Sequence, residues 1–340
     1  MTPKIMIILG SGTDISIANK AMDILDKLEI PYSLKIASAH RTPNLVREIV
    51  TQATDAGIEV FIGIAGLAAH LPGSIAAYTP RPVIGVPVDV KTGGMDALQS
   101  IVQMPYPSPI ATVGIDRGDN AAILAAQFIG LHDEEVHQKI IKLRKEYAKK
   151  VIESNENLIQ PINRPFIKND FIRIRDLEIN KFQADAENSG CKNKDAEVAI
   201  IVGRQNDVVT AKKLTKILDR LKITYDMKVV CPIRSNKKFH DYIKSMKNAK
   251  IFIGVSSNSS QVTGGLVGLT ARPVIGVPCT NENGDDYMLT TVSMPPGVPV
   301  ATVGINNGKN AAVLTGEIIG IGNSEMVDLL DKLKDKKINL

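Results

Sequence analysis

The chain has 340 residues, of which 44% are hydrophobic and 23% charged, and its formal net charge is +5 at pH 7. This length is enough for two domains that each bury a core, and the composition is typical of a globular protein. No block of Lys and Arg is interleaved with aromatic residues, which argues against nucleic acid as a partner.

The cysteines and the first residues predict where the protein resides. Cys191, Cys231 and Cys279 lie far apart without C-x-x-C spacing, as is typical of a reducing compartment. The apolar run near Met1 is short and leads into glycine, so we interpret it as a first strand and not as a signal or membrane segment. We therefore expect a cytoplasmic protein that binds no membrane.

Taken in chain order, the first half of the sequence alternates short apolar runs with amphipathic stretches. Strands are predicted at residues 5–9, 32–37, 59–65, 83–88 and 110–115. Helices are predicted at 17–28, 45–56 and 120–131, followed by a longer, charged helix at 132–153. This alternation predicts the α/β class, with βαβ units around a central parallel sheet.

The second half of the sequence repeats the first. The heptapeptide Arg-Pro-Val-Ile-Gly-Val-Pro at 81–87 recurs letter for letter at 272–278, and Ala-Thr-Val-Gly-Ile at 111–115 recurs at 301–305. The period is too long for a solenoid unit, so each repeat must be a domain. We name residues 1–157 copy one and residues 195–340 copy two. The segment between them, 158–194, contains Phe166, Phe171 and Phe182, and we expect its first part to dock on a domain.

Two polar loops follow the first two strands of copy one. Ser11 and Asp14 lie between the first strand and a helix, and Ser38 and Arg41 follow the second strand. The carboxyl ends of parallel strands meet at one edge of a sheet, so these side chains should lie together. Hydroxyls, a helix N-terminus and a guanidinium favour a phosphate. The glycine loop alone is a weak signal, since Asp14 could simply cap a helix.

Two histidines occur only in copy one. His40 belongs to the second loop, where an imidazole can carry a proton near neutral pH. His70 belongs to a loop of small residues after the third strand. The small residues leave room for a ligand, and His70 would provide a polar side to that room. Copy two has Ile233 and Gln261 at these positions, so the chemistry is predicted to occur in copy one.

Several motifs together resemble one family. They are Gly10-Ser11 with Asp14, Ser38-Ala-His-Arg-Thr-Pro43, Ala68-Ala-His-Leu-Pro-Gly73, Gly85-Val-Pro87 and Ser100-Ile-Val-Gln-Met-Pro105. They are similar to the phosphoribosylaminoimidazole carboxylase family of purine biosynthesis, the PurE family, which includes the N5-carboxyaminoimidazole ribonucleotide mutases. The resemblance implies flavodoxin-like three-layer domains, a particle of eight domains, active sites shared between neighbouring domains, and neither a metal nor a redox cofactor.

The resemblance also implies residue roles, and the motifs resemble the mutase class more than the class that carboxylates aminoimidazole ribonucleotide directly with CO2. His40 and His70 would be catalytic, with His40 as general acid and base. The substrate would be bound by the remaining residues of the three loops, namely Ser11, Asp14, Ser38, Ala39, Arg41, Gly66, Ala68 and Leu71. Thr13 replaces the usual serine, and Leu67 replaces a glycine beside the expected CO2 pocket.

The role of copy two stays open between two hypotheses. It retains Asp207 and Arg234, which could bind an anion, so a non-catalytic nucleotide-binding regulatory module is one alternative. The other, which we favour, is that copy two only completes the particle. Eight domains would then need four chains, and closed symmetry predicts a homotetramer.

Overall fold

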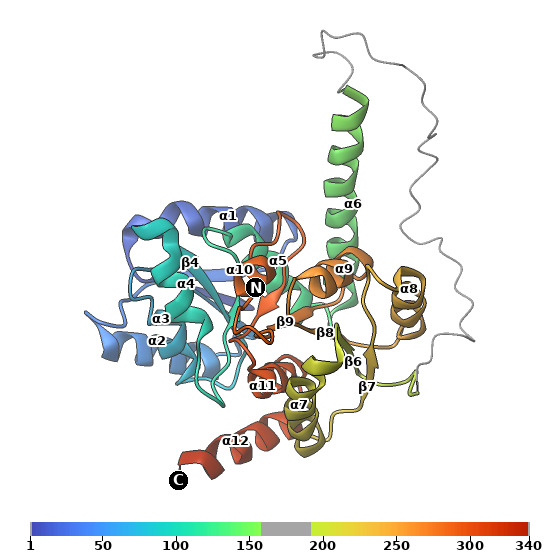
Figure 1. Ribbon diagram of the computed structural model, residues 1–340. Coiled ribbons are helices and arrows are strands. Elements are labelled where there is room, and N and C mark those ends of the chain that lie inside the picture. Colours follow the sequence, from blue (N-terminus) through green and yellow to red (C-terminus); the bar gives the residue numbers. More distant parts are fainter. Residues whose placement is uncertain (1, 158–191, 339–340) are drawn as a thin grey trace.

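The computed structural model describes residues 2–157 and 192–338 (Figure 1). The predicted docking of the linker concerns residues that lie almost entirely outside these ranges. Within them, ten strands form one sheet in the order β2-β1-β3-β4-β5-β10-β9-β8-β6-β7. The strands of copy one are β1 (Ile5–Leu9), β2 (Tyr32–Ile36), β3 (Val60–Gly66), β4 (Val83–Val88) and β5 (Ala111–Thr112). Those of copy two are β6 (Val198–Val202), β7 (Tyr225–Val229), β8 (Ile251–Ser256), β9 (Val274–Pro278) and β10 (Ala301–Thr302).

Each half of the sheet is parallel, and its strand order is that of flavodoxin. The halves join edge to edge where β5 and β10 pair antiparallel, with Thr112 opposite Thr302. Apolar and β-branched runs such as β1 are buried throughout, as expected for strands covered on both faces. The predicted fold of two tandem flavodoxin-like halves is confirmed, and the continuous sheet that joins them is an addition.

Helices cover both faces of the sheet, so each half has three layers (Figure 1). The helices of copy one are α1 (Ile15–Lys27), α2 (Pro43–Asp55), α3 (Leu71–Ala76), α4 (Met95–Val102), α5 (Gly118–Ile129) and α6 (Glu134–Asn157). Those of copy two are α7 (Val208–Arg220), α8 (Asn236–Ser245), α9 (Gln261–Leu269), α10 (Met288–Val292), α11 (Gly308–Ile319) and α12 (Ser324–Ile338).

The structure corrects two of the predicted elements and adds two short helices. The strand expected at 110–115 has only two residues in the sheet, because the chain leaves the sheet where the halves meet. The short helices α3 and α4 were not predicted, since six and eight residues are too few to show a clear helical period. The long charged helix begins at Glu134, since Asp133 caps its first turn by accepting a hydrogen bond from the Val136 amide at 3.2 Å.

Helix α6 is the last helix of copy one. It contacts copy two and extends beyond the body of the molecule (Figure 1). Val136, Ile140 and Leu143 are buried in the shared core. The Arg144 guanidinium donates hydrogen bonds to carbonyls of copy two, those of Val267 and Thr270. This helix of copy one therefore packs against copy two of the same chain.

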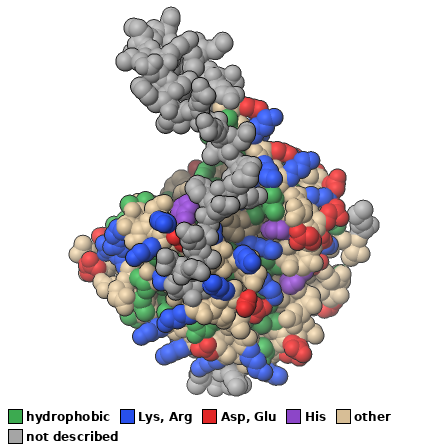
Figure 2. Space-filling model, turned by 90° about the vertical axis from the view of Figure 1, so that its right-hand side faces the viewer, with side chains coloured by type: hydrophobic (Ala, Val, Ile, Leu, Met, Phe, Trp, Pro, Cys, Tyr) green, Lys and Arg blue, Asp and Glu red, His purple; other side chains and the backbone are tan. Residues whose placement is uncertain are grey.

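The described surface carries charges of both signs. Lys and Arg side chains are spread over the face shown in Figure 2, with Asp and Glu among them. Within the part of the chain that the structure describes, no helix is both long enough and apolar enough to span a membrane.

Candidate active site

A hollow of about 480 Å³ lies at the carboxyl ends of β1, β2 and β3. The parallel register aligns Leu9 with Ile36 and with Ile64, so the loops that follow the three strands leave the sheet at the same edge. This copy-one hollow is lined by all ten of the predicted site residues, namely Ser11, Asp14, Ser38, Ala39, His40, Arg41, Gly66, Ala68, His70 and Leu71. The structure therefore brings together three loops that are separate in the sequence.

The two histidines of these loops are in direct contact. His40 Nε2 lies 2.9 Å from His70 Nδ1, and the two rings meet edge to face at 4.9 Å between centroids. One imidazole must donate and the other accept, so a single hydrogen atom lies between them. The pair can take up one further proton without losing this bond, whereas a second would place two N–H groups against each other. This arrangement suits a group that accepts and returns one proton.

Arg41 is oriented by the backbone of the glycine loop. Its Nη2 donates to the Gly10 carbonyl at 2.9 Å, and its backbone N–H donates to Ser38 Oγ at 3.2 Å. Ser38 is in turn held by Thr42, whose hydroxyl oxygen accepts from the Ser38 amide at 3.0 Å. The guanidinium uses two of its five donors on the protein, since Nε also donates to Ser38 Oγ at 3.4 Å, and it keeps the others for an anion. The arrangement can hold a phosphate beside the histidine pair.

Asp14 is buried at the base of the hollow, in the short turn before α1. Burial raises the pKa of its carboxyl group, and hydrogen bonds from the Thr13 side chain and the Ser11 backbone together with Arg41 oppose this rise. The Thr13 hydroxyl donates to Asp14 Oδ1 at 3.1 Å, so the threonine preserves the bond that a serine would make. Asp14 can accept hydrogen bonds from ligand hydroxyls.

The loop after β3 has an unusual backbone. Leu67 has a φ of 58°, in the left-handed region that favours glycine. Its neighbour Gly66 has no room for a side chain, because a Cβ there would lie 2.5 Å from Val90 Cγ2. Val90 lines the hollow and was missed from the sequence, although it follows β4 at the same sheet edge. The signal in the sequence that points to Val90 is its place just after the fourth parallel strand.

Copy two has a corresponding hollow of about 460 Å³ with different chemistry. Arg234 Nη2 donates to the Gly203 carbonyl at 2.9 Å, which reproduces the contact of Arg41 with Gly10. Arg204 Nη1 lies 3.7 Å from Glu282 Oε1. The loop after β8 contributes no residue to the lining of this hollow. An anion could meet guanidinium groups there, but neither histidine has a counterpart.

Cys231 occupies the position of Ser38 in this copy-two hollow. Burial alone would raise the pKa of its thiol, but backbone hydrogen bonds from Arg234 and Ile233 and the charge of Arg234 lower it. The Cys231 thiol is therefore more easily ionised than that of an ordinary cysteine.

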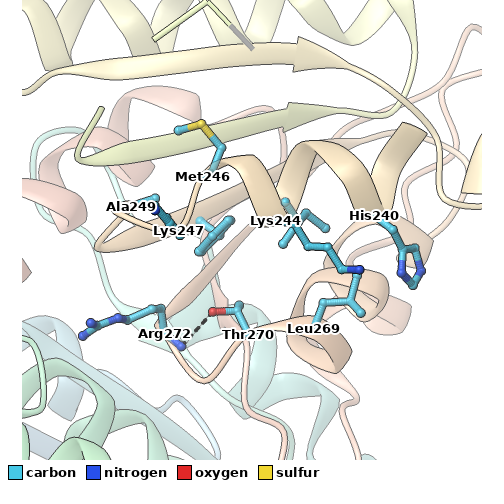
Figure 3. A pocket seen from close by; sticks show the side chains of 10 residues that line it. His240, Lys244, Met246, Lys247, Ala249, Leu269, Thr270 and Arg272 are labelled. Carbon is cyan, nitrogen blue, oxygen red and sulfur yellow. Dashed lines mark hydrogen bonds between the residues drawn. The ribbon is translucent and has the colours of Figure 1, made fainter. Parts of the chain in front are cut away.

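A third hollow, of about 260 Å³, lies in copy two at the amino ends of β8 and β9 (Figure 3). Basic side chains such as Lys247 and Arg272 line it, and the Arg272 amide donates to Thr270 Oγ1 at 3.0 Å. Sites in open α/β sheets form at the carboxyl ends of strands, so this hollow is on the opposite edge from the two described above. It takes no part in the candidate site.

The remaining copy-one histidines lie at the junction between the copies. Burial lowers the pKa of His132, while a hydrogen bond with the Ile318 backbone opposes the shift. Burial likewise lowers the pKa of His137, and Arg272 adds to that effect. Neither residue lines the copy-one hollow. Their positions indicate a packing role.

Comparison with known proteins gives the family. The model of the AIR carboxylase family matches the chain twice, over residues 4–150 and 197–339. The chain belongs to the AIR carboxylase family. Because the model matches in both halves, the tandem duplication inferred from the repeats is confirmed.

Individual relatives agree with this assignment. The chain is 67% identical over 340 residues, all of both chains, to a probable N5-carboxyaminoimidazole ribonucleotide mutase of Methanobrevibacter smithii. It is 47% identical, over 99% of both chains, to a protein of the same name from Methanothermobacter thermautotrophicus. A solved structure of Treponema denticola PurE is 28% identical with a TM-score of 0.43, and covers 46% of this chain and 98% of that chain.

Proposed function

We propose that this protein is an N5-carboxyaminoimidazole ribonucleotide mutase of purine biosynthesis, and that its chemistry takes place in copy one. The observation that carries the proposal is the His40–His70 pair at 2.9 Å in a hollow that also presents Arg41. The names of the full-length relatives support the substrate class. Ser11, Asp14, Ser38, Ala39 and Arg41 would bind the ribose and its phosphate.

The proposed mechanism moves one carboxylate and returns one proton. As the bond between nitrogen 5 and the carboxylate breaks, the electron pair returns to nitrogen and His40 delivers a proton there. The products at this stage are aminoimidazole ribonucleotide and CO2, which the loop with Gly66, Ala68, His70 and Leu71 encloses. Carbon 4 then attacks the CO2, and His40 removes the proton from carbon 4. His70, hydrogen-bonded to His40, orients the ring and stabilises its charged form.

One experiment tests this proposal against direct carboxylation. Purified chain is given N5-carboxyaminoimidazole ribonucleotide without ATP, and separately aminoimidazole ribonucleotide with CO2. A mutase forms 4-carboxy-5-aminoimidazole ribonucleotide rapidly from the first and slowly from the second. Rapid turnover only with free CO2 would support the carboxylase alternative, and turnover with neither would reject both.

The proposal includes the organisation of the chain and its assembly. Residues 1–157 would be the catalytic domain, 158–194 a partly docked linker, and 195–340 a domain without catalysis, in a cytoplasmic protein. If the particle has eight domains, four chains complete it, and the arrangement is a homotetramer. Light scattering tests this last point, and a stable monomer or an octamer of full chains would contradict it.

A further inference from the structure

Two asparagines hold the copies together in a reciprocal way. Asn120 Nδ2 in copy one donates to the carbonyls of Met294 at 3.3 Å and Pro295 at 3.0 Å in copy two. Asn310 Nδ2 in copy two donates to the carbonyls of Met104 at 3.0 Å and Pro105 at 3.3 Å in copy one. Both asparagines are buried, so each amide replaces water as the partner of these carbonyls. Each copy therefore fixes the loop that follows α4 or α10 of the other.

The two contacts differ in two respects. Asn120 Oδ1 accepts from the Gly297 amide at 3.0 Å, whereas Asn310 Oδ1 is buried without a partner among the described residues. Pro107 occupies the position of Gly297 in copy one, and proline has no N–H to donate. The second difference is an added donor, since Asn307 Nδ2 also donates to the Met104 carbonyl at 3.1 Å. Copy two thus places two amide groups on the carbonyl of one residue, Met104.

The side chain of Met104 connects this contact to the candidate active site. A Cβ added to Gly73 would lie 3.3 Å from Met104 Cε and 3.5 Å from its sulfur, so the methionine packs on the first turn of α3. His70 is the N-cap residue of α3, and its carbonyl accepts from the Ser74 amide at 2.9 Å. The equivalent glycine of copy two, Gly264, has nothing within 4 Å of such a Cβ. Among the described residues, the contact of this methionine with the glycine of the first helical turn therefore occurs in copy one and not in copy two.

A hydrophobic cluster between the copies supports the same loop. Leu98 and Val102 of α4 pack against Met288 and Val292 of α10, and all four side chains are buried. This cluster and the asparagine contact together restrain both sides of the turn at Met104. A restrained Met104 leaves α3, and with it His70, less freedom to shift relative to His40.

We propose that copy two is a positioning domain for the active site of copy one, and that Asn310 is its positioning residue, acting through Met104 and Gly73 on His70. The inference rests on the proposed function for its kinetic readout. It gives copy two, which lacks counterparts of His40 and His70, a role beyond completing the particle. Misplacing a catalytic group by about 1 Å can lower turnover by roughly 100-fold, so small shifts of α3 have a measurable effect.

The test compares Asn310→Ala with its matched control, Asn120→Ala, in the full chain. Each substitution removes two hydrogen bonds to a methionine and a proline carbonyl at the junction, and Asn120→Ala also removes the bond from the Gly297 amide, so the control should lose at least as much stability as Asn310→Ala. Asn310→Ala should lower kcat by roughly 10- to 100-fold with KM within about twofold, because the substrate contacts remain. Asn120→Ala should leave kcat within about twofold. Equal effects on kcat, or an unchanged kcat in Asn310→Ala, would overturn the proposal.

Two further measurements keep the test decisive. If Asn310→Ala does not fold, Met104→Ala and its control Met294→Ala take its place, with the same contrast expected in kcat. Crystal structures of the variants without substrate give a readout independent of turnover. The distance from His40 Nε2 to His70 Nδ1, 2.9 Å here, should lengthen in Asn310→Ala and stay unchanged in Asn120→Ala. A chain that never converts the substrate would reject the proposed function, while these distances would still decide on positioning.

Discussion

The loops after β3 and β8 have the same backbone form and opposite chemistry. Leu67 in copy one and Asn258 in copy two both have a positive φ, of 58° and 72°. In copy one the loop lines the hollow and presents His70 to His40. In copy two Asp207 Oδ2 instead accepts a hydrogen bond from the Ser257 amide at 3.1 Å, and the loop does not line the hollow. Copy two therefore has the scaffold of this hollow without counterparts of the two histidines, because the packing of the loop and its polar contacts depend on different side chains.

The largest expected effect comes from His40. His40→Asn should lower kcat by roughly 100-fold or more, since general acid–base catalysis contributes about that much, while the fold remains intact. The control is Ile233→Asn at the exposed equivalent position of copy two, which should leave steady-state turnover unchanged. Turnover of His40→Asn close to the wild type, or activity that disappears only with Ile233→Asn, would place catalysis elsewhere.

Glu317 in copy two corresponds to Gln127 in copy one. The two residues should therefore affect the pH dependence of stability differently. Burial raises the Glu317 pKa to about 7, and Lys334 at 3.0 Å opposes the rise. The folded state therefore holds this proton more tightly than the unfolded state, and stability falls as the pH rises from about 4.5 towards 7. The fall should be up to about 3 kcal/mol, measured by urea unfolding at pH 5 and pH 8.

Glu317→Gln should remove this pH dependence and make the chain more stable at pH 8. Gln127→Glu should introduce such a pH dependence and make the chain less stable at pH 8. Gln127 Nε2 donates to the Ala271 carbonyl at 3.1 Å, whereas a carboxylate there would face another acceptor. The same pH dependence in wild type and Glu317→Gln would show that Glu317 is already ionised in the folded state; this comparison cancels the opposite contribution of the buried His132 and His137.

Arg41 and Arg234 have the same carbonyl contact, at 2.9 Å in both copies, but only Arg41 shares its hollow with the histidines. Arg41→Ala should raise KM by roughly tenfold or more, the effect of losing a charge-assisted hydrogen bond to phosphate. Arg234→Ala should leave KM within about twofold. A matching rise in both variants would mean that copy two also binds the substrate.

The smallest expected effect concerns the left-handed position. Leu67→Asn should stabilise the chain by about 0.5–1 kcal/mol, since asparagine tolerates this conformation better than leucine. Asn258→Leu should destabilise it by a similar amount, and thermal unfolding measures both. Destabilisation by Leu67→Asn would show that the apolar side chain contributes more than the backbone strain removes.

The sequence by itself determined the fold class, the duplication and the set of candidate residues. Alternating apolar runs predicted the strands of copy one, and β4 coincides with the expected 83–88. The predicted site residues were expected to lie close together because parallel strands end at one edge of the sheet. This rule needs only the order and direction of the strands. His40 and His70 were therefore expected in one hollow before any distance was known.

Only the tertiary structure decided how the copies are joined and which groups touch. The pairing of Thr112 with Thr302 depends on two short edge strands that meet in three dimensions. The distance of 2.9 Å between His40 and His70 depends on the register of three strands and on the left-handed turn at Leu67. The contact of Asn310 with Met104 joins residues far apart in the chain, and local sequence patterns report neighbours along an element, not partners across the core.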